Sequence, residues 1–291
     1  MKLLLTGAGG QLGREIINIA KRQSDVELHP LSRRELDVTN RSQVIRTVMT
    51  IKPDVIINAS AYTSVDQAET DTEDALTVNA HGSQYIAEAA QEYNCKMCHI
   101  STDYVFDGRS TRPYEENDPV NPISVYGHSK ALGEKYVRQI CEKHFIVRTS
   151  WLYSAYGANF VHTMLRLGND PGVESVRVVN DQTGSPTWTF DFACFLLQLI
   201  QTEYYGTYHV SNSGSTTWYE FTKEIFRLAS IAKPVVPVQT SEFPRPARRP
   251  AYSVLGSKKI VEQGFQPLRS WNDALIAYFQ SIKEVLPYED C

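Results

Sequence analysis

Two residues of the chain, Tyr126 and Lys130, have the types and the spacing that acid–base chemistry requires. They lie four residues apart in the segment SVYGHSKALGEK. On a helix, this spacing places both side chains on one face. A lysine cation close to a tyrosine favours the phenolate and lowers the tyrosine pKa, which makes the phenol a usable acid near neutral pH. The pair therefore predicts a proton donor, although tyrosine and lysine at this spacing also occur by chance on exposed helices.

A glycine-rich segment near the N-terminus has the pattern of a dinucleotide site. TGAGGQLG places Gly7, Gly10 and Gly13 at a G-x-x-G-x-x-G spacing, after an apolar run at 2–6 and before apolar residues at helical spacing over 11–20. Glycines between a strand and a helix allow a tight turn, close approach of the backbone to a pyrophosphate and close helix–strand packing. We therefore predict a pyrophosphate site at the start of this helix. An ordinary glycine-rich turn is the alternative.

The elements that must position these residues alternate between strand and helix through the first half of the chain. This alternation predicts an α/β protein with a Rossmann-type, doubly wound parallel sheet, whose ligands bind beyond the carboxyl ends of the strands. We expect residues 1–150 to form the NAD(P)-binding Rossmann domain, with some later segments returning to it. Residues 151–291 should form mainly a smaller C-terminal α/β substrate-binding lobe. The expected strands are 2–6, 26–31, 54–60, 96–102 and 145–153, and the expected helices are 11–20, 40–51, 71–93, 124–143, 189–202, 218–229 and one from 271.

Composition restricts the class of protein. The 291 residues are 42% hydrophobic and 21% charged, which is typical of a globular chain. The net charge of −4 argues against a general nucleic-acid binder. No apolar run approaches the roughly 18 residues that span a membrane, and the N-terminal LLL is too short for a signal peptide. Cys95 and Cys98 form a C-x-x-C pair, but no second pair completes a zinc site. We expect a cytoplasmic protein with neither nucleic-acid nor membrane partners.

Four segments together, TGAGGQLG, NASAYTSVD, STDYVFDG and YGHSK, resemble the extended short-chain dehydrogenase/reductases, which act on nucleotide sugars. Three further motifs are similar to those of the branch that reduces dTDP-linked 4-keto sugars: NDQTGSPT, RTSWLY followed by GANF, and PRPARRPAYSVL. The resemblance covers both halves of the chain. It implies reduction of the 4-keto group of dTDP-4-keto-6-deoxy-L-mannose to dTDP-L-rhamnose, with NADPH or NADH as the hydride source.

The resemblance implies catalytic and substrate-binding roles for five residues. Tyr126 matches the proton donor to the sugar O4, and Lys130 would lower the pKa of Tyr126 and hold the nicotinamide ribose. Thr102 would hydrogen-bond the carbonyl oxygen and orient it. Asp103 and Trp151 match residues that contact the sugar, while a strand-end turn and a core tryptophan are their alternatives.

The resemblance also implies a row of cofactor contacts. Gly10, Gln11 and Leu12 would meet the pyrophosphate, and Asp37 and Val38 would lie beside the adenine. Asp37 alone could equally be a helix-entry residue. The residues expected at the cofactor are Gly7, Gly10, Gln11, Leu12, Gly13, Arg33, Asp37, Val38, Ala59, Ser60, Ala61, Tyr62, Tyr126 and Lys130.

The end of the second expected strand bears on the choice of cofactor. An acidic residue there would bind the ribose 2′-OH of NAD, whereas arginine accommodates the 2′-phosphate of NADP. The segment LSRRE presents Ser32, Arg33 and Arg34 before any acid. We therefore predict a preference for NADPH, with Arg33 at the 2′-phosphate. Glu35 argues the other way, and a solvated charge cluster is the alternative.

Two more residues are candidates for ligand contacts. Arg249, in the RPARRP loop, could bind the substrate diphosphate, because an arginine fork matches phosphate oxygens. An exposed basic loop is the alternative. Some family members are described as homodimers with Mg²⁺ held by glutamates at the interface. Glu15 matches one such glutamate, so the metal and the homodimer stay open.

Other functions on the same fold are distinguished by particular residues. A 4,6-dehydratase would carry Asp-Glu after the active-site threonine, whereas here Asp103 is followed by Tyr104. A 4-epimerase has no need of NDQTGSPT and PARRP. A non-catalytic NADP-binding regulatory subunit, such as the β subunit of methionine adenosyltransferase, is also similar to the family. An intact set of Thr102, Tyr126 and Lys130 favours catalysis over that last alternative.

Overall fold

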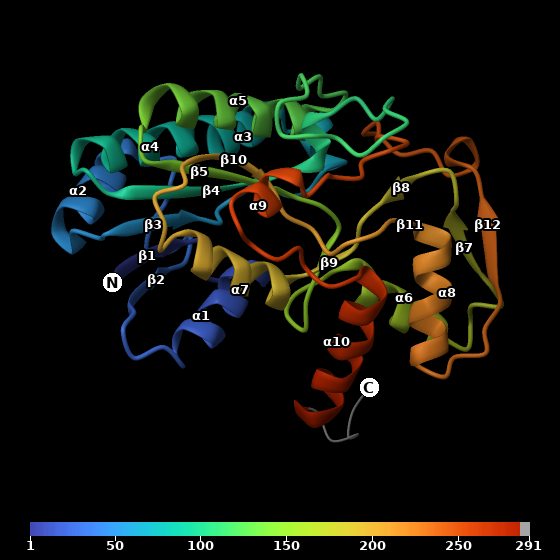
Figure 1. Cartoon of the computed structure of the whole chain (residues 1–291). Coiled ribbons are helices and arrows are strands. Elements are labelled where there is room, and N and C mark those ends of the chain that lie inside the picture. The colour runs from blue at the N-terminus through green and yellow to red at the C-terminus, as the bar shows by residue number, and fades with distance from the viewer. Residues whose placement is uncertain (286–291) are drawn as a thin grey trace.

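The structure is a computed structural model that describes residues 1–285 of the chain. At its centre lies a six-stranded sheet with the order β10-β5-β4-β3-β1-β2 (Figure 1). Every neighbouring pair in it is parallel, which confirms the predicted fold class. The strands are β1 (Lys2–Thr6), β2 (Glu27–Leu31), β3 (Val55–Asn58), β4 (Lys96–Thr102), β5 (His144–Thr149) and β10 (Gly206–His209). The strand order reverses between β1 and β3, and such a switch point is where ligands bind in doubly wound sheets.

Helices cover both faces of this sheet (Figure 1). On one face Leu4, Ile56 and Met97 pack under helices that follow β2, β3 and β4, and on the other face Leu3 and Leu5 pack under α1 and α7. Burial on both faces explains the nearly continuous apolar runs in these strands. The helices are α1 (Gln11–Ala20), α2 (Arg41–Ile51), α3 (Thr72–Leu76), α4 (Gly82–Glu92), α5 (Val125–Ile140) and α7 (Thr189–Leu199).

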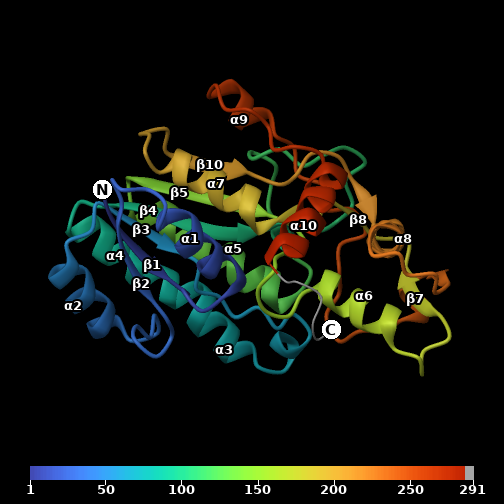
Figure 2. The same cartoon turned by 90° about the horizontal axis from the view of Figure 1, so that it is seen from below.

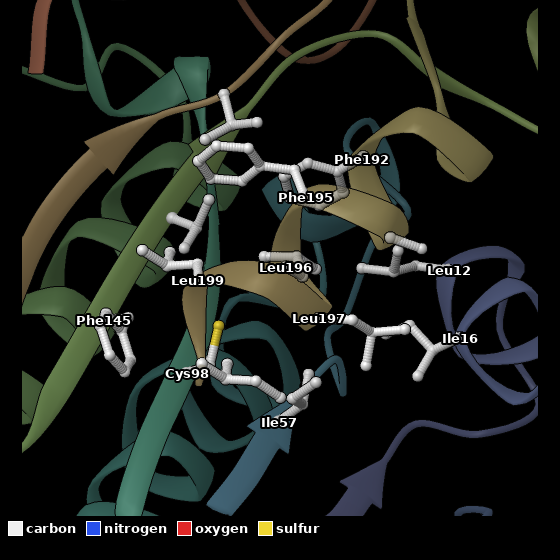
Figure 3. Close-up of a cluster of buried hydrophobic side chains, with 14 of the residues drawn as sticks. Leu12, Ile16, Ile57, Cys98, Phe145, Phe192, Phe195, Leu196, Leu197 and Leu199 are labelled. Carbon is white, nitrogen blue, oxygen red and sulfur yellow. The ribbon is translucent and has the colours of Figure 1, made fainter. Parts of the chain in front are cut away.

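The core beneath α7 contains one cysteine of the C-x-x-C pair. Figure 3 shows Phe192 and Leu196 of α7 beside Leu12 of α1, with Cys98 and Ile57 from the sheet below them. Cys98 is fully buried, and burial raises the pKa of its thiol. The cysteine is therefore a packing residue of the core, and the thiolate that a metal or a redox partner would need is disfavoured there.

The second half of the chain both completes the first sheet and builds a second lobe. Strand β10 pairs with β5, and α7 packs against α1, so two late segments return to the first lobe. Figures 1 and 2 show most of the remaining elements gathered at one end of the six-stranded sheet. They are β6 (Leu152–Tyr153), α6 (Phe160–Asn169), β7 (Val176–Val179), β8 (Thr183–Gly184), β9 (Thr187–Trp188), β11 (Thr216–Thr217), α8 (Trp218–Leu228), β12 (Val235–Val238) and α10 (Trp271–Val285). Helix α9 (Lys258–Glu262) instead lies beside β10, and its Ile260 joins the core beneath α7. The division at residue 150 stays a prediction.

Several elements differ from those expected. The helix predicted over 71–93 is interrupted by a π-helical turn at Thr77–His81, between α3 and α4. The strand predicted over 145–153 breaks after Thr149, because Trp151 takes a positive φ of 47°. Helix α6 was missed, although Asn159 caps it by accepting from the N–H of His162. Among residues 1–285, no helix has the length and the apolar character needed to cross a membrane.

Candidate active site

A cavity of about 680 Å³ opens along the carboxyl ends of β1, β3, β4 and β5. It lies at the switch point between β1 and β3 and continues to the second lobe, where Phe160 and Trp218 close it. Arg249 and Glu15 are not in its wall. The lining residues named from the sequence are Gly7, Gly10, Gln11, Leu12, Gly13, Arg33, Asp37, Val38, Ala59, Ser60, Ala61, Tyr62, Thr102, Asp103, Tyr126, Lys130 and Trp151.

The glycine turn forms the floor of the cavity, and two of its glycines are sterically required. Gly7 has a φ of +70°, and a Cβ there would lie 2.6 Å from the backbone carbon of Ala59 at the end of β3. A Cβ on Gly13 would overlap the carbonyl oxygen of Gly7. The N-cap of α1 is Gly10, which has no side chain to cap the helix, so the first N–H groups of α1 stay available to a ligand. Together with the helix dipole, this bare turn fits a pyrophosphate.

At one end of the cavity, the charged residues after β2 divide into two groups. Arg33 lines the cavity, whereas Glu35 does not. The Glu35 carboxylate instead accepts from the backbone N–H of Ser32 at 2.8 Å and from its hydroxyl at 2.7 Å. These hydrogen bonds lower the Glu35 pKa. The acid that argued against NADPH is therefore engaged within its own turn, and of Arg33 and Glu35 it is the arginine that lines the cavity.

Asp37 both lines the cavity and organises the entry to α2. Its Oδ1 accepts from the N–H of Thr39 at 3.0 Å and from the Thr39 hydroxyl at 2.8 Å. The helix cap itself is Asn40, which accepts from the N–H of Gln43. Asp37 therefore combines the two alternatives that its sequence position left open, a cavity residue and a turn residue.

The π-helical turn holds the loop after β3 against the cavity. Asn79, in this turn, accepts from the N–H of Tyr62 at 2.8 Å and donates to the carbonyl oxygen of Tyr62 at 3.1 Å. It also donates to the Ser129 hydroxyl at 2.9 Å, and that hydroxyl donates to the Tyr126 carbonyl oxygen at 2.8 Å. Single-turn π bulges often occur at functional sites. Here the bulge ties the wall of the cavity to the helix that carries Tyr126 and Lys130.

Tyr126 and Lys130 face the cavity from α5, but their electrostatics differ from expectation. Lys130 is 2% exposed, and its Nζ donates to the carbonyl oxygen of Ile100 at 2.6 Å. Burial lowers the pKa of Lys130 to about 8. Burial raises the pKa of Tyr126 to about 12, and an interaction with Thr102 only partly opposes this. The predicted lowering of the Tyr126 pKa by Lys130 is therefore not found: Lys130 is not among the groups that shift this pKa, and desolvation dominates it.

Thr102 and Asp103, at the end of β4, complete this part of the wall. The Thr102 hydroxyl donates to Asp103 Oδ1 at 3.0 Å and accepts from the N–H of Tyr104 at 3.2 Å. Asp103 is 2% exposed, and burial raises its pKa to about 6. Three buried polar atoms of the cavity wall have no partner among the described residues: Gln11 Oε1, Asp103 Oδ2 and Thr149 Oγ1. Such atoms are available to the polar groups of a ligand.

A buried ion pair connects α5 to β5, and a hydrogen bond from Ser101 extends it to β4. The Glu134 carboxylate accepts from the Arg148 guanidinium at 2.8 and 2.7 Å and from the Ser101 hydroxyl at 2.6 Å. Glu134 lies one helical turn after Lys130, and Ser101 directly precedes Thr102. Through the Ser101 bond, Glu134 fixes the helix that carries Tyr126 and Lys130 to the strand that carries Thr102. No local pattern indicates this group of three residues, because Ser101, Glu134 and Arg148 come from three separate elements.

Arg249 and Glu15 lie outside the cavity wall. The Arg249 guanidinium forms two hydrogen bonds to the Asp66 carboxylate, each of 2.9 Å, so its role at a diphosphate stays a prediction. Glu15 of α1 is 5% exposed, and its carboxylate accepts a hydrogen bond from the hydroxyl of Thr189 in α7 at 3.2 Å. Burial raises the Glu15 pKa. Within residues 1–285, no group of three His, Cys, Asp or Glu side chains is placed to hold a metal.

Sequence reasoning assigned no site role to three aromatic residues of the cavity wall, Tyr104, Phe160 and Trp218. The ring of Trp218 stacks on that of Trp151, with 3.4 Å between the centroids and 6° between the planes. Phe160 ends the GANF segment that carried part of the resemblance, so a signal for it was present. Trp218 follows Thr217, the cap of α8, and had no such signal.

Comparisons with known proteins agree along nearly the whole chain. The family model described as the RmlD substrate binding domain matches residues 1–284. A dTDP-4-dehydrorhamnose reductase of Aggregatibacter actinomycetemcomitans is 43% identical, covering 94% of this chain and 97% of that protein. The spore coat polysaccharide biosynthesis protein SpsK of Bacillus subtilis is 41% identical, covering 96% and 97%. The crystal structure of a dTDP-4-dehydrorhamnose reductase from Bacillus anthracis in complex with NADP is similar with a TM-score of 0.92, at 43% identity, covering 96% of this chain and 99% of that one.

Proposed function

We propose that this chain, which belongs to the RmlD substrate-binding-domain family, is an NADPH-dependent reductase of dTDP-4-dehydrorhamnose. The product would be dTDP-L-rhamnose, formed by reduction of the 4-keto group to a hydroxyl. Two relatives named dTDP-4-dehydrorhamnose reductase are 43% and 37% identical to this chain, and the matches cover 94% and 93% of it. The observation that carries the proposal is the meeting of Thr102, Tyr126 and Lys130 in one cavity whose other end is a bare glycine turn.

The cavity fits a dinucleotide at one end and a polar substrate at the other. The pyrophosphate would lie on the uncapped start of α1, where the surrounding backbone leaves no room for a side chain at positions 7 and 13. Arg33 would face the 2′-phosphate of NADPH, since its fork matches phosphate oxygens. The unpaired Asp103 Oδ2 and Thr149 Oγ1 lie beside the catalytic groups and would accept hydrogen bonds from sugar or cofactor hydroxyls.

The chemistry divides between the cofactor and the chain. NADPH, when bound, supplies the hydride that forms the new C–H bond at the keto carbon. Tyr126 holds a proton at its phenol oxygen throughout the neutral range, because burial raises its pKa to about 12. A sugar alkoxide is much more basic than a phenolate, so this proton passes to O4 as charge develops there. Lys130, held on the Ile100 carbonyl, would stabilise the phenolate that remains.

Thr102 and Asp103 would orient the keto group. The Thr102 hydroxyl donates to Asp103, and turning it toward the substrate oxygen would release Asp103 Oδ1 to accept from a sugar hydroxyl. The two residues therefore form a paired donor and acceptor at the end of β4. A homodimer, a bound Mg²⁺ and a cytoplasmic location stay predictions from the sequence.

The test is NADPH oxidation with dTDP-4-keto-6-deoxy-L-mannose generated in situ, followed by nicotinamide absorbance. We expect wild-type protein to oxidise NADPH and Tyr126→Phe to lose about 10²- to 10⁴-fold in rate, because a positioned proton donor contributes this much. NADPH affinity should stay within about twofold. Tyr204→Phe is the matched control, since Tyr204 is 51% exposed and lies outside the cavity wall. Tight NADPH binding without oxidation by the wild type would favour the regulatory-subunit alternative.

A further inference from the structure

The motif NDQTGSPT has no part in the chemistry described so far, yet it surrounds a strained residue of the cavity wall. Trp151 takes a φ of 47°, a region that bulky side chains rarely adopt. Strain of this kind persists only where neighbouring structure enforces it, and it is concentrated at functional sites. The neighbours that enforce it here come from the NDQTGSPT segment and from the start of α8.

Gly184, in the centre of this motif, lies against the indole of Trp151. A Cβ at this position would overlap Cε2 of the ring and would lie 2.6 Å from Cζ2 and 2.7 Å from Nε1. Real Cβ atoms do not approach other atoms so closely, so any larger residue at position 184 must displace the ring. Gly184 does not have a positive φ, so its backbone conformation does not require glycine. The close contact with the Trp151 ring does.

Trp218 holds the same indole by stacking, with 3.4 Å between the ring centroids. Phe160 packs against Trp218 with a centroid distance of 4.3 Å and an angle of 42° between the rings. The two contacts on Trp151 share one origin: Thr216 of β11 pairs with Gly184 of β8, and Trp218 follows directly after β11. The short β8–β11 ladder therefore brings both neighbours to the ring.

The backbone around Trp151 is fixed to the same motif. Its carbonyl oxygen accepts from the N–H of Thr187 at 3.1 Å, and the Ser150 hydroxyl donates to the carbonyl oxygen of Ser185 at 2.7 Å. The pairing of β6 with β9 continues this connection. Both the strained backbone and the ring of Trp151 are thus anchored by residues 184–187.

We propose that Gly184 and Trp218 are positioning residues that hold the Trp151 indole as a fixed apolar platform for the sugar of the nucleotide-sugar substrate. This inference rests on the proposed function for the identity of the ligand. The platform lies in the same cavity as Thr102 and Tyr126. Aromatic faces stack on the C–H-rich face of a sugar, and a 6-deoxy sugar offers more apolar surface than its hydroxylated counterpart. A displaced indole would weaken binding of the sugar and leave binding of the nucleotide intact.

The first experiment separates the sugar from the nucleotide by comparing the Kd of dTDP-L-rhamnose with that of dTDP in Gly184→Ala. We expect the affinity for dTDP-L-rhamnose to fall about tenfold, which corresponds to the loss of one good aromatic contact. The affinity for dTDP and for NADPH should not change. Gly172→Ala is the matched control, because a Cβ there meets only the flexible Asp170 side chain at 3.3 Å. Equal losses for both nucleotides, or no loss for either, would overturn the proposal.

The second experiment is a double-mutant cycle between Gly184→Ala and Trp151→Phe. A phenylalanine ring lacks the indole atoms that the new Cβ would strike, so Gly184→Ala should cost almost nothing in the Trp151→Phe background. The cost of Gly184→Ala should vanish in this background both for ligand affinity and for the free energy of unfolding. The cycle therefore tests the Gly184–Trp151 contact even if Gly184→Ala folds poorly. The same cost in both backgrounds contradicts the proposal.

A third measurement is independent of any ligand. The chain has four tryptophans, so it gives four indole N–H resonances, of which Trp151→Phe identifies one. Gly184→Ala and Trp218→Leu should shift that resonance, whereas Trp271→Phe should only remove its own. If the wild type binds neither dTDP-L-rhamnose nor dTDP, the proposed function fails, while the Trp151 resonance still decides whether Gly184 and Trp218 hold the ring.

Discussion

The substitution Glu134→Gln tests the buried ion pair that connects α5 to β5. The Glu134 and Arg148 side chains are 1% and 2% exposed, and they form two hydrogen bonds of 2.8 and 2.7 Å. Glutamine can still accept at Oε1 from Ser101 and from the Arg148 Nε. Its amide group, however, replaces the oxygen that accepts from Arg148 Nη2 and removes the negative charge. The variant therefore leaves a buried guanidinium without its counter-ion.

The magnitude follows from this burial. Removing one partner of a buried pair costs about 3–5 kcal/mol, whereas an exposed pair contributes about 0–1 kcal/mol. We expect Glu134→Gln to lower the free energy of unfolding by about 3–5 kcal/mol, a large part of the 5–15 kcal/mol that domains usually have. Because Glu134 also raises the pKa of Lys130, the variant should lower that pKa below its present value of about 8.

The assay is urea-induced unfolding at neutral pH, with Glu224→Gln as the matched control. Glu224 pairs with Arg227 through hydrogen bonds of 2.8 and 2.6 Å, similar in geometry to the buried pair, but Arg227 is 61% exposed. The control should lose no more than about 1 kcal/mol. If the two variants lose equal stability, or if Glu134→Gln loses less than about 1 kcal/mol, the reasoning from burial is refuted.

Three other substitutions give expected outcomes at separate parts of the fold. Arg33→Glu should reverse the preference between NADPH and NADH, measured as the ratio of the two kcat/KM values; an unchanged ratio would place the 2′-phosphate elsewhere. The buried Asp103 carboxylate takes up a proton as the pH drops through about 6, so the substrate affinity of the wild type should fall there. Asp103→Asn should remove this pH dependence of the substrate affinity. Burial lowers the pKa of His209 from 6.5 to about 3, so between these pH values the unfolded chain binds one more proton than the folded chain. As the pH falls through this range, His209 should lower the free energy of unfolding by about 1.4 kcal/mol per pH unit. His209→Gln should remove that part of the slope in unfolding titrations, and an unchanged slope would contradict the assignment.

Sequence reasoning succeeded where the signal is local. The strand–glycine–helix unit around Gly7 and Gly13 depends on neighbouring residues, and its bounds agree with those of β1 and α1. The spacing of Tyr126 and Lys130 likewise fixed their common face on α5. The alternation of apolar strands with amphipathic helices was enough to predict a parallel sheet, since only burial on both faces explains runs such as 55–58.

The rest depends on contacts between residues far apart in the chain. Arg249 meets Asp66 across 183 positions, and no local pattern shows that its guanidinium is engaged by a carboxylate. The strand expected over 145–153 breaks at Trp151 because distant residues hold that ring. The pKa of Tyr126 is set by how much protein surrounds it, and spacing to Lys130 does not contain that information.

The two kinds of residue have different parts in the proposed reaction. Groups that act on the cofactor and the keto oxygen lie at strand ends and on one helix, where short motifs place them. The groups that hold the sugar platform, Gly184 and Trp218, come from a ladder of two short strands in the second lobe. A change in that ladder would alter which sugar is held without moving Tyr126 or the glycine turn. Sugar selectivity can therefore vary within this fold while the chemical step stays the same.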